Sequence, residues 1–449
     1  MDRLIHVSYP RETQGSIALC QRDISEILHL GAGCRRYKRK MRMMPLSRTA
    51  RSIPIASRVN RFSYAIRNIV AEAQAVEAAG TPVRYLNIGD PASFGFQPPV
   101  HMIEAVERAM RDGHNGYLAS PGIAAAREAV AADYTAKGVP ISADRVLITT
   151  GTSEAIDLVL NALVDEGEEV LVPLPTYPLY TAVIAKIGAE ARYYRTDPKR
   201  NWQPDIDHLR SLVTPRTRVL VTIDPNNPTG AVYSPSVRRA LLEIAEENGL
   251  TILADEVYGE LGFDGPVPLL GTLDRDAAVI SLSSLSKAYL APGWRTGWVV
   301  LGATSRLNDT LAAMKKLADG RLCSPGPMQY AVVAALTGDR SHQVMFRKAL
   351  AERARNTAEA FNAMPGMRCV SPHAAFYAMP MLSLPPGRTD EDYVLTLLRE
   401  TGILCVYGSG FGMPPEAGSF RIVYLADPVE LQSIYADIAA FTRRYLQQA

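Results

Sequence analysis

The sequence predicts an α/β protein whose larger domain is built on a mostly parallel β-sheet. Apolar, β-branched runs recur between about residues 146 and 302, and helical patterns separate them, as expected of βα units. Several of these runs end abruptly in polar or turn-forming residues, and ligands of open α/β sheets bind at such strand ends. The chain has 449 residues, enough for two domains, and the shorter strand patterns between residues 367 and 425 predict a small α+β domain.

The individual elements can be placed in order from apolar spacing and turn residues. Apolar residues at helical spacing predict a helix within residues 57–80, which Gly80-Thr81-Pro82 ends, and a short strand at 83–88 follows. Further helices are predicted at residues 98–112, from 155 onward, over most of 305–361 and at 390–401. Further strands are predicted at residues 146–149, 169–172, 218–223, 250–254, 277–282, 403–406 and 420–425.

The composition is typical of a soluble globular protein, with 47% hydrophobic and 21% charged residues. A formal net charge of +2 gives no argument for nucleic acid or another acidic partner. No apolar run approaches the ~18 residues of a membrane span. The five cysteines are scattered without metal-ligand spacing, which favours a reducing compartment, and we expect a cytoplasmic protein without a metal: Cys20, Cys34, Cys323, Cys369 and Cys405.

The N-terminal residues differ from the remainder in charge. Residues 1–60 hold 12 Lys+Arg against 4 Asp+Glu, a net +8, with a basic run at Arg35–Arg42. Such a segment is typical of an arm that binds nucleic acid or a membrane surface, or of a targeting peptide, although no apolar core for secretion is visible. A start codon assigned too early is a further interpretation. We expect residues 1–56 to be a basic, disordered extension without a nucleic-acid or membrane partner.

Three polar residues follow three successive strand ends. Asn227 comes after the run at 218–223, Asp255 directly after 250–254, and Lys287 after 277–282, with spacings of 28 and 32 residues. Because the carboxyl ends of parallel strands share one edge of a sheet, these residues should lie close together. Each has a simpler interpretation: Asn-Pro-Thr-Gly is common in turns, Asp255 could cap a helix, and Lys287 could lie at the surface.

These residue types suit one small molecule that carries an aldehyde and a phosphate, pyridoxal 5'-phosphate (PLP). A lysine in a confined pocket can lose its proton and attack a carbonyl, and the hydroxyls near Lys287 together with Arg295 are suited to a phosphate. A carboxylate at Asp255 would keep the ring nitrogen protonated, which makes the ring an electron sink. Asn227 and Tyr258 can donate hydrogen bonds to the phenolate oxygen of the ring.

The motifs around these residues resemble those of the fold-type I PLP enzymes, and within them of the class I/II aminotransferases. The similarity extends from about residue 57 to the C-terminus and is closest to the alanine (glutamate–pyruvate) aminotransferases. The stretches that carry it are Leu86–Phe96, Asn201–Ile206, Pro225–Tyr233 and Phe420–Val423. The resemblance implies an arm with part of the small domain at residues 57–100, a large PLP-binding domain with a seven-stranded sheet at 101–340, and a small domain at 341–449.

The resemblance also implies further roles in the cofactor site. Tyr177 matches the aromatic residue that stacks on the pyridine ring, with core packing as the alternative interpretation. Tyr117 matches a tyrosine that reaches the cofactor phosphate of the partner subunit, which implies a homodimer with shared active sites. The turn before the helix from residue 155 is a suitable phosphate site, because helix N-termini present free N–H groups. The expected phosphate ligands are Gly151, Thr152, Ser153, Ser284 and Arg295; Ser153 could instead be only an N-cap.

The resemblance further implies that the substrate is held by the backbone at Gly89, by Asn227 and by Arg421. Arg421 lies mid-strand between apolar residues, where it would grip the α-carboxylate with two parallel hydrogen bonds or form a structural ion pair. Phe94 and Phe96 are either core residues or walls of the pocket; as walls, which we expect, they would narrow the space beside the reacting carbon and favour a small side chain.

The predicted activity is ping-pong transamination between an L-amino acid and a 2-oxo acid, with Lys287, Asp255 and Tyr177 as catalytic residues. Alanine and glutamate, with pyruvate and 2-oxoglutarate, are the expected substrates. Two residues depart from the pattern of the relatives. Asp224 replaces an asparagine, and the effect of this change should be minor. Near Pro325, alanine aminotransferases carry an asparagine that this sequence lacks. An aromatic- or methionine-preferring or biosynthetic aminotransferase, a PLP lyase or synthase, and an aminotransferase-like transcription regulator therefore stay open. A regulator would need a helix-turn-helix, of which no second recognition helix is visible.

Overall fold

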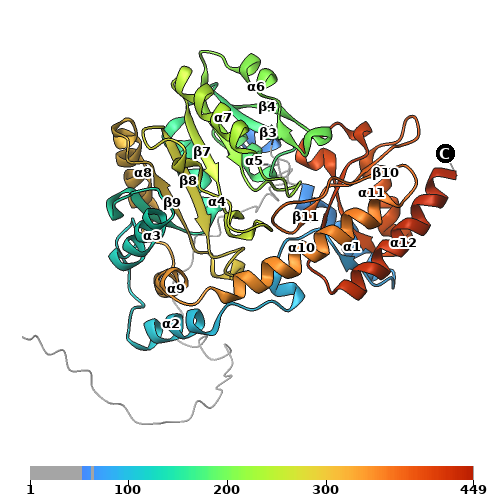
Figure 1. Ribbon diagram of the computed structural model, residues 1–449, viewed down its shortest axis with the longest axis horizontal. Helices are drawn as coiled ribbons and strands as arrows, with labels where there is room; N and C mark the ends of the chain where they lie inside the picture. Colours follow the sequence, from blue (N-terminus) through green and yellow to red (C-terminus); the bar gives the residue numbers. More distant parts are fainter. Residues whose placement is uncertain (1–52, 62–64, 448–449) are drawn as a thin grey trace, which may run out of the picture. The chain divides into compact units, whose positions relative to one another are not determined.

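The computed structural model describes residues 53–61 and 65–447 (Figure 1). The fold below belongs to one compact unit, Ile55–Ala449. The predicted basic extension at residues 1–56 lies outside the described residues except for its last four. Among the residues that are described, no helix is both long and apolar enough to cross a membrane.

The centre of the larger domain is an eight-stranded sheet with the order β2-β9-β8-β7-β6-β3-β4-β5. The strands β4, β3, β6, β7 and β8 are parallel, whereas β9 runs antiparallel to both of its neighbours and β5 runs antiparallel to β4. The bounds are β2 (Val146–Thr149), β3 (Glu169–Leu174), β4 (Glu190–Asp197), β5 (Gln203–Pro204), β6 (Thr217–Ile223), β7 (Thr251–Asp255), β8 (Val279–Ser284) and β9 (Gly297–Leu301).

The mostly parallel sheet confirms the predicted fold, and one short strand enlarges it from the expected seven. Asn201 and Trp202 both adopt positive φ angles, of 55° and 57°, which turn the chain back so that the two residues of β5 pair with the end of β4. Two residues are too few for a periodic pattern, so this edge strand has no signature in the sequence.

Helices cover both faces of the sheet, which explains why its strands are almost continuously apolar. Successive residues of β6 show this: Val219 and Val221 pack with α4, α5 and α8 on one face, whereas Leu220 packs with α6 and α7 on the other. Helices α2 and α3 pack against α9. The bounds are α2 (Val100–Arg111), α3 (Ala124–Ala136), α4 (Thr152–Leu163), α5 (Pro178–Lys186), α6 (Ile206–Leu212), α7 (Pro235–Glu247), α8 (Asn308–Arg321) and α9 (Gly326–Thr337).

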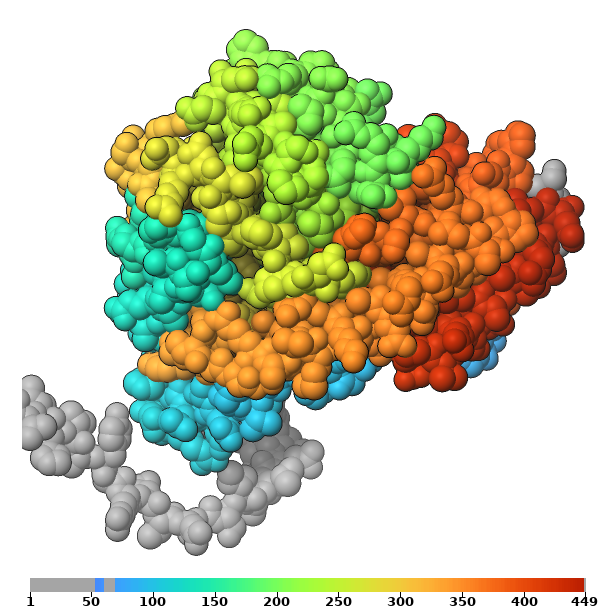
Figure 2. Space-filling view, in the orientation of Figure 1, coloured from blue at the N-terminus to red at the C-terminus, as the bar shows by residue number. Residues whose placement is uncertain are grey.

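The small domain is assembled from segments that are far apart in the sequence. Strand β1 (Arg84–Tyr85) pairs in parallel with β13 (Ile403–Leu404), and β15 (Phe420–Val423) lies between β11 (Tyr377–Ala378) and β14 (Val406–Tyr407). A third pair consists of β10 (Met367–Arg368) and β12 (Met381–Leu382). The surrounding helices are α1 (Ala65–Ala78), α10 (Ser341–Asn362), α11 (Asp390–Thr401) and α12 (Pro428–Gln447). Figure 2 shows α10 at the surface, running toward the C-terminal segments. The boundaries near residues 100 and 340 stay predictions.

Several predicted elements differ in their ends, and three of them lie near the site or lead to it. The helix expected over 57–80 is a 3-10 turn at Ser57–Arg61 followed by α1. Helix α4 begins at Thr152 rather than at residue 155, because Gly151 with φ 76° occupies the N-cap position. The strand expected over 83–88 is shorter, Arg84–Tyr85, and beyond it the carbonyl oxygen of Asn87 accepts a hydrogen bond from the side chain of Arg421.

Asp224 has a larger structural role than its expected minor one. Its Oδ2 accepts from Nε of Arg238 at 2.7 Å, its Oδ1 accepts from the N–H of Tyr233 at 3.1 Å, and both members of the ion pair are buried. Burial raises the pKa of Asp224, and the charge of Arg238 opposes that shift. The pair therefore ties the loop after β6 to α7.

Asp224→Asn should lower the free energy of unfolding by about 3 kcal/mol, because it leaves the buried guanidinium of Arg238 without a charged partner. Urea unfolding followed by circular dichroism measures this change. The matched control is Glu247→Gln, which neutralises the carboxylate in an exposed ion pair between Glu247 and Arg210. This change should alter the unfolding midpoint little. Equal midpoints for the two variants would contradict the structural role of the Asp224–Arg238 pair.

Candidate active site

A cavity of about 390 Å³ opens at the carboxyl edge of the sheet and is completed by the small domain. In the large domain its walls come from α4, the loop after β3, the ends of β6 and β7, and the loop after β8. The other walls come from α1, the segment after β1, β11 and β15. The lining consists of Val70, Ile88, Gly89, Thr152, Tyr177, Ile223, Asn227, Asp255, Val257, Tyr258, Lys287, Tyr377 and Arg421. Eight of the predicted site residues are among them.

Asp255 is the last residue of β7 and is only 4% exposed. Its Oδ2 accepts a hydrogen bond from the hydroxyl of Tyr180 at 2.9 Å, and its Oδ1 accepts from the N–H of Val257 at 3.4 Å. Burial raises the pKa of Asp255 to about 6, while these donors and the charge of Lys287 act in the opposite direction. A cationic ring nitrogen beside this carboxylate would favour its ionised form.

Lys287 lies three residues beyond the end of β8. Its Nζ donates to the carbonyl oxygen of Gly89 at 2.8 Å and lies 5.6 Å from the ring centroid of Phe376. A Cβ added at Gly89 would overlap the hydroxyl of Tyr377 and the ring of Phe376, so only glycine lets this backbone come so close. The amine of Lys287 therefore reaches the segment that contains Gly89.

The predicted phosphate ligands gather around the start of α4. The guanidinium of Arg295 lies over Gly151, and its Nη2 donates to the carbonyl oxygen of Thr150 at 3.3 Å. Ser284 is paired in the sheet with Gly297, which packs against the backbone of Gly151. The first-turn N–H groups of a helix have no intrahelical acceptor, so Thr152 and Ser153 add donors at the same place. Within this group, Thr152 lines the cavity itself.

Arg421 lies in β15 and is 2% exposed. Its Nη1 donates to Oδ1 of Asn227 at 3.1 Å, and its Nη2 donates to the carbonyl oxygen of Asn87. The rings of Tyr377 and Phe411 flank the guanidinium, with centroids 4.7 and 4.8 Å from its Cζ. Two neutral acceptors and two aromatic faces therefore fix the orientation of this cation at the wall of the cavity.

Two of the predicted walls lie elsewhere. Phe96 packs against Phe346 at 4.8 Å between ring centroids, and Phe94 lines a different cavity, of about 700 Å³. The expectation that both rings form walls of the candidate site is wrong, and the alternative of core packing describes them. Asp90 caps a 3-10 turn over Pro91–Phe94, and this turn directs the two rings to the core of the small domain.

Tyr117 does not line the cavity of its own chain. It is 87% exposed on the loop before α3, and the next residue, Leu118, donates its N–H to Sγ of Cys323 at 3.4 Å. This contact places the Tyr117 loop beside the segment that contains Pro325, the N-cap of α9.

Several residues of the site were not predicted. Tyr180 could have been found, because it follows Tyr177 by one helical turn after a strand end. Tyr377 lies in a two-residue strand, and nothing in the local pattern distinguishes it from a core tyrosine. The apolar lining residues Val70, Ile88, Ile223 and Val257 likewise carry no chemical signature.

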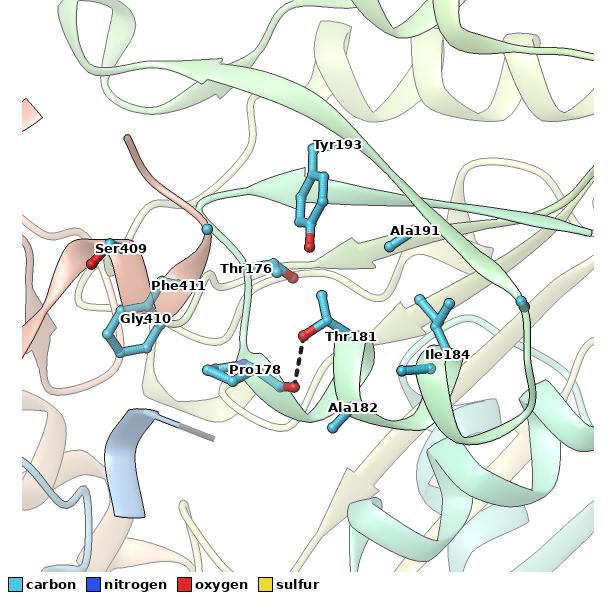
Figure 3. Close-up of a pocket in the computed structure, with 13 residues that line it drawn as sticks. Thr176, Pro178, Thr181, Ala182, Ile184, Ala191, Tyr193, Ser409, Gly410 and Phe411 are labelled. Atoms are coloured by element: carbon cyan, nitrogen blue, oxygen red, sulfur yellow. Dashed lines mark hydrogen bonds between the residues drawn. The ribbon is translucent and has the colours of Figure 1, made fainter. Parts of the chain in front are cut away.

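Another cavity, of about 320 Å³, lies between α5, β4 and the loop Ser409–Gly412 (Figure 3). Its lining consists of small, apolar and hydroxyl side chains, among them Thr181, which donates to the carbonyl oxygen of Pro178 at 3.0 Å. No carboxylate, amine or guanidinium belongs to that lining among the described residues. The cavity with Lys287 is therefore the candidate active site.

A sequence model of the aminotransferase class I and II family matches residues 81–436. The chain belongs to this family. It is 36% identical over 405 residues to the glutamate-pyruvate aminotransferase AlaA of Haemophilus influenzae, which covers 88% of this chain and 100% of that protein. It is also 36% identical to an alanine aminotransferase of Mycobacterium tuberculosis, over 88% of this chain and 94% of that one.

Solved structures give the same assignment. The alanine aminotransferase of Pyrococcus furiosus superimposes with a TM-score of 0.85 at 37% identity, over 87% of this chain and 100% of that chain. The aspartate aminotransferase of Thermus thermophilus with maleate superimposes with a TM-score of 0.79 at 26% identity, over 87% of this chain and 100% of that chain. The family and the fold predicted from the sequence are confirmed, and the protein is a PLP-dependent aminotransferase.

The residues of the cavity fit PLP. A buried carboxylate at Asp255, an amine at Lys287, and an arginine over a helix N-terminus occur at one edge of the sheet. The carboxylate and the arginine match the ring nitrogen and the phosphate in charge, and the amine matches the aldehyde in reactivity. The family assignment therefore favours an aminotransferase over a transcription regulator on the same scaffold.

Arg421→Ala should weaken the binding of every amino acid and 2-oxo acid substrate together, by about 2–5 kcal/mol. The reason is that the buried pair between Arg421 and the substrate carboxylate would lose one member. Steady-state kinetics with several substrates measures the change in kcat/KM, and thermal melting verifies folding. The control is Arg399→Ala, which removes an exposed guanidinium of the same domain and should leave kcat/KM unaltered. A loss confined to one substrate would contradict a shared role in carboxylate binding.

Proposed function

We propose that this aminotransferase exchanges amino groups between alanine and glutamate and their 2-oxo acids, pyruvate and 2-oxoglutarate. The observation that carries this proposal is the agreement of two comparisons on alanine aminotransferases, at 36% sequence identity and at a TM-score of 0.85. The mouse tyrosine aminotransferase, at 30% identity, and the Thermus aspartate enzyme, at 26%, are less similar. We also propose a cytoplasmic homodimer in which the exposed Tyr117 reaches the site of the partner subunit.

The roles of the cofactor-side residues follow from their places in the cavity. When bound, PLP supplies an aldehyde that reacts with amines and a ring that accepts negative charge from the α-carbon. Asp255 would hold a proton on the ring nitrogen by its charge, Tyr177 would pack against the ring, and Asn227 and Tyr258 would donate to the phenolate oxygen. Thr152, Ser153 and Arg295 would bind the phosphate with Gly151 and Ser284.

Lys287 would be the group that moves protons. The amine at Nζ would take the α-proton of the substrate as a general base and then, as a general acid, would give a proton back during the same half-reaction. Its hydrogen bond to Gly89 shows that Nζ reaches the backbone segment that would lie against the substrate. Arg421 would hold the α-carboxylate, so the α-hydrogen of each substrate would be presented to the same amine.

A second candidate is an aminotransferase that prefers aromatic residues or methionine. Two observations favour it: the similarity to a tyrosine aminotransferase over 86% of the chain, and the departure at Pro325 beside the Tyr117 loop. The apolar wall formed by Val70 and Ile88 suits a methyl group as well as a larger apolar side chain.

Lys287→Ala should reduce kcat by about 10²–10⁴-fold or more, because no other amine among the described residues lines the cavity. Borohydride reduction of the wild type, followed by peptide mapping, should locate the cofactor adduct on Lys287. Lys186→Ala, which removes an exposed lysine of α5, should retain the adduct and the activity. An adduct on any other lysine would end this assignment.

A substrate panel tests the specificity. Alanine with 2-oxoglutarate should be among the best pairs, since a cavity of about 390 Å³ must accommodate both cofactor and substrate and so favours a small side chain. Coupled assays of amino acids against pyruvate and 2-oxoglutarate give kcat/KM for each pair. A tenfold or greater preference for phenylalanine or methionine over alanine, about 1.4 kcal/mol, would overturn the alanine assignment and leave the aminotransferase assignment intact.

A further inference from the structure

Tyr377 contacts a residue on each side of the candidate active site. It lies in β11 and is 2% exposed, and its hydroxyl oxygen is 2.9 Å from that of Tyr258. The two rings meet edge to face, with centroids 5.6 Å apart. Tyr258 follows β7 in the large domain, so this contact joins the two domains at the cofactor side of the cavity.

The ring of Tyr377 also supports the substrate side. Its face lies 4.7 Å from the guanidinium carbon of Arg421, a distance at which a cation is attracted to an aromatic ring. Its hydroxyl lies against Gly89, where any side chain would overlap it. One side chain therefore touches the predicted phenolate donor, the predicted carboxylate ligand and the segment that accepts from Lys287.

We propose that Tyr377 is a positioning residue that orients the hydroxyl of Tyr258 and supports the guanidinium of Arg421. This inference rests on the roles proposed above for Tyr258 and Arg421.

The direction of the hydrogen bond follows from the number of protons. Each tyrosine hydroxyl has one proton to donate and two lone pairs that accept. Burial, and then the nearby Tyr377 hydroxyl, raise the pKa of Tyr258 well above its ordinary value, so Tyr258 keeps its proton. If Tyr258 donates that proton to the phenolate oxygen of the cofactor, Tyr377 must donate to Tyr258. A hydroxyl that accepts a hydrogen bond becomes a stronger donor, so Tyr377 strengthens the contact with the cofactor.

The hydroxyl and the ring of Tyr377 make separable contributions. Tyr377→Phe keeps the ring beside Arg421 and removes the hydroxyl. The cofactor oxygen then loses part of its hydrogen-bond support and holds its proton to higher pH, so the midpoint of the pH-dependent visible absorption should rise by about 0.5 unit. The dissociation constant of PLP should rise about threefold, whereas KM for amino acids should change less than about twofold, since the ring remains.

Tyr377→Leu removes the ring as well. KM for amino acid and 2-oxo acid substrates should then rise together, by about 2–10-fold, in addition to the spectral shift. Tyr393→Phe is the matched control, because it removes a buried hydroxyl that lies 2.8 Å from the hydroxyl of Thr442, outside the cavity. It should leave the absorption midpoint, PLP affinity and KM unchanged, and thermal melting of all variants reports any loss of folding.

Tyr258→Phe separates this inference from the proposed function. It should shift the absorption midpoint more than Tyr377→Phe does, and adding Tyr377→Phe to it should produce no further shift, since the two residues act in series. A shift in Tyr258→Phe with none in Tyr377→Phe would overturn the inference alone. No shift in Tyr258→Phe would overturn the proposed role of Tyr258 itself. A Tyr377→Phe shift that adds fully to that of Tyr258→Phe would show that Tyr377 does not act through Tyr258.

Discussion

A buried guanidinium is costly unless its N–H groups and its charge are accommodated, and the arrangement around Arg421 depends on that requirement. Its acceptors come from the Asn227 loop, 194 residues earlier in the chain, and from the Asn87 segment, 334 residues earlier. Because one acceptor belongs to the large domain and the other to the arm, the cation joins three parts of the chain at one point. The cavity walls are positioned relative to one another through this point.

The opposite end of the cavity is organised by a buried charge of the other sign. Asp255 is surrounded by neutral donors rather than by a paired cation, and burial brings its pKa to about 6. A positively charged ligand stabilises the ionised form of a buried carboxylate whose pKa is raised, so the site favours a protonated ring nitrogen. The lysine between the two ends lies close enough to influence Asp255 but is held by a carbonyl rather than by the carboxylate.

The local sequence pattern was sufficient to predict the site residues that lie at strand ends. Asp255 ends a buried strand, Asn227 and Lys287 follow two others within four residues, and the topology of a parallel sheet brings them together without further information. The rings of Phe94 and Phe96 could not be placed in this way, because their direction is set by a capped 3-10 turn and by the core against which it packs. The pair of Tyr258 and Tyr377 was also beyond the sequence, since 119 residues separate its members and β11 has no periodic pattern. The ion pair between Asp224 and Arg238 shows the same limit for charged side chains.

The pairing of β1 with β13 has a consequence for the order in which the protein can be completed during synthesis. The strands of the large sheet are all made before residue 302, so this domain can fold while the later segments are still being translated. Arg84 and Tyr85, however, must wait for Ile403 and Leu404, made more than 300 residues later, and Arg421 follows later still. In a nascent chain, the large sheet with its cofactor-binding residues therefore forms before the residue that would bind the substrate carboxylate is made. Cofactor binding and substrate binding are thus separated in time during synthesis, as well as in space.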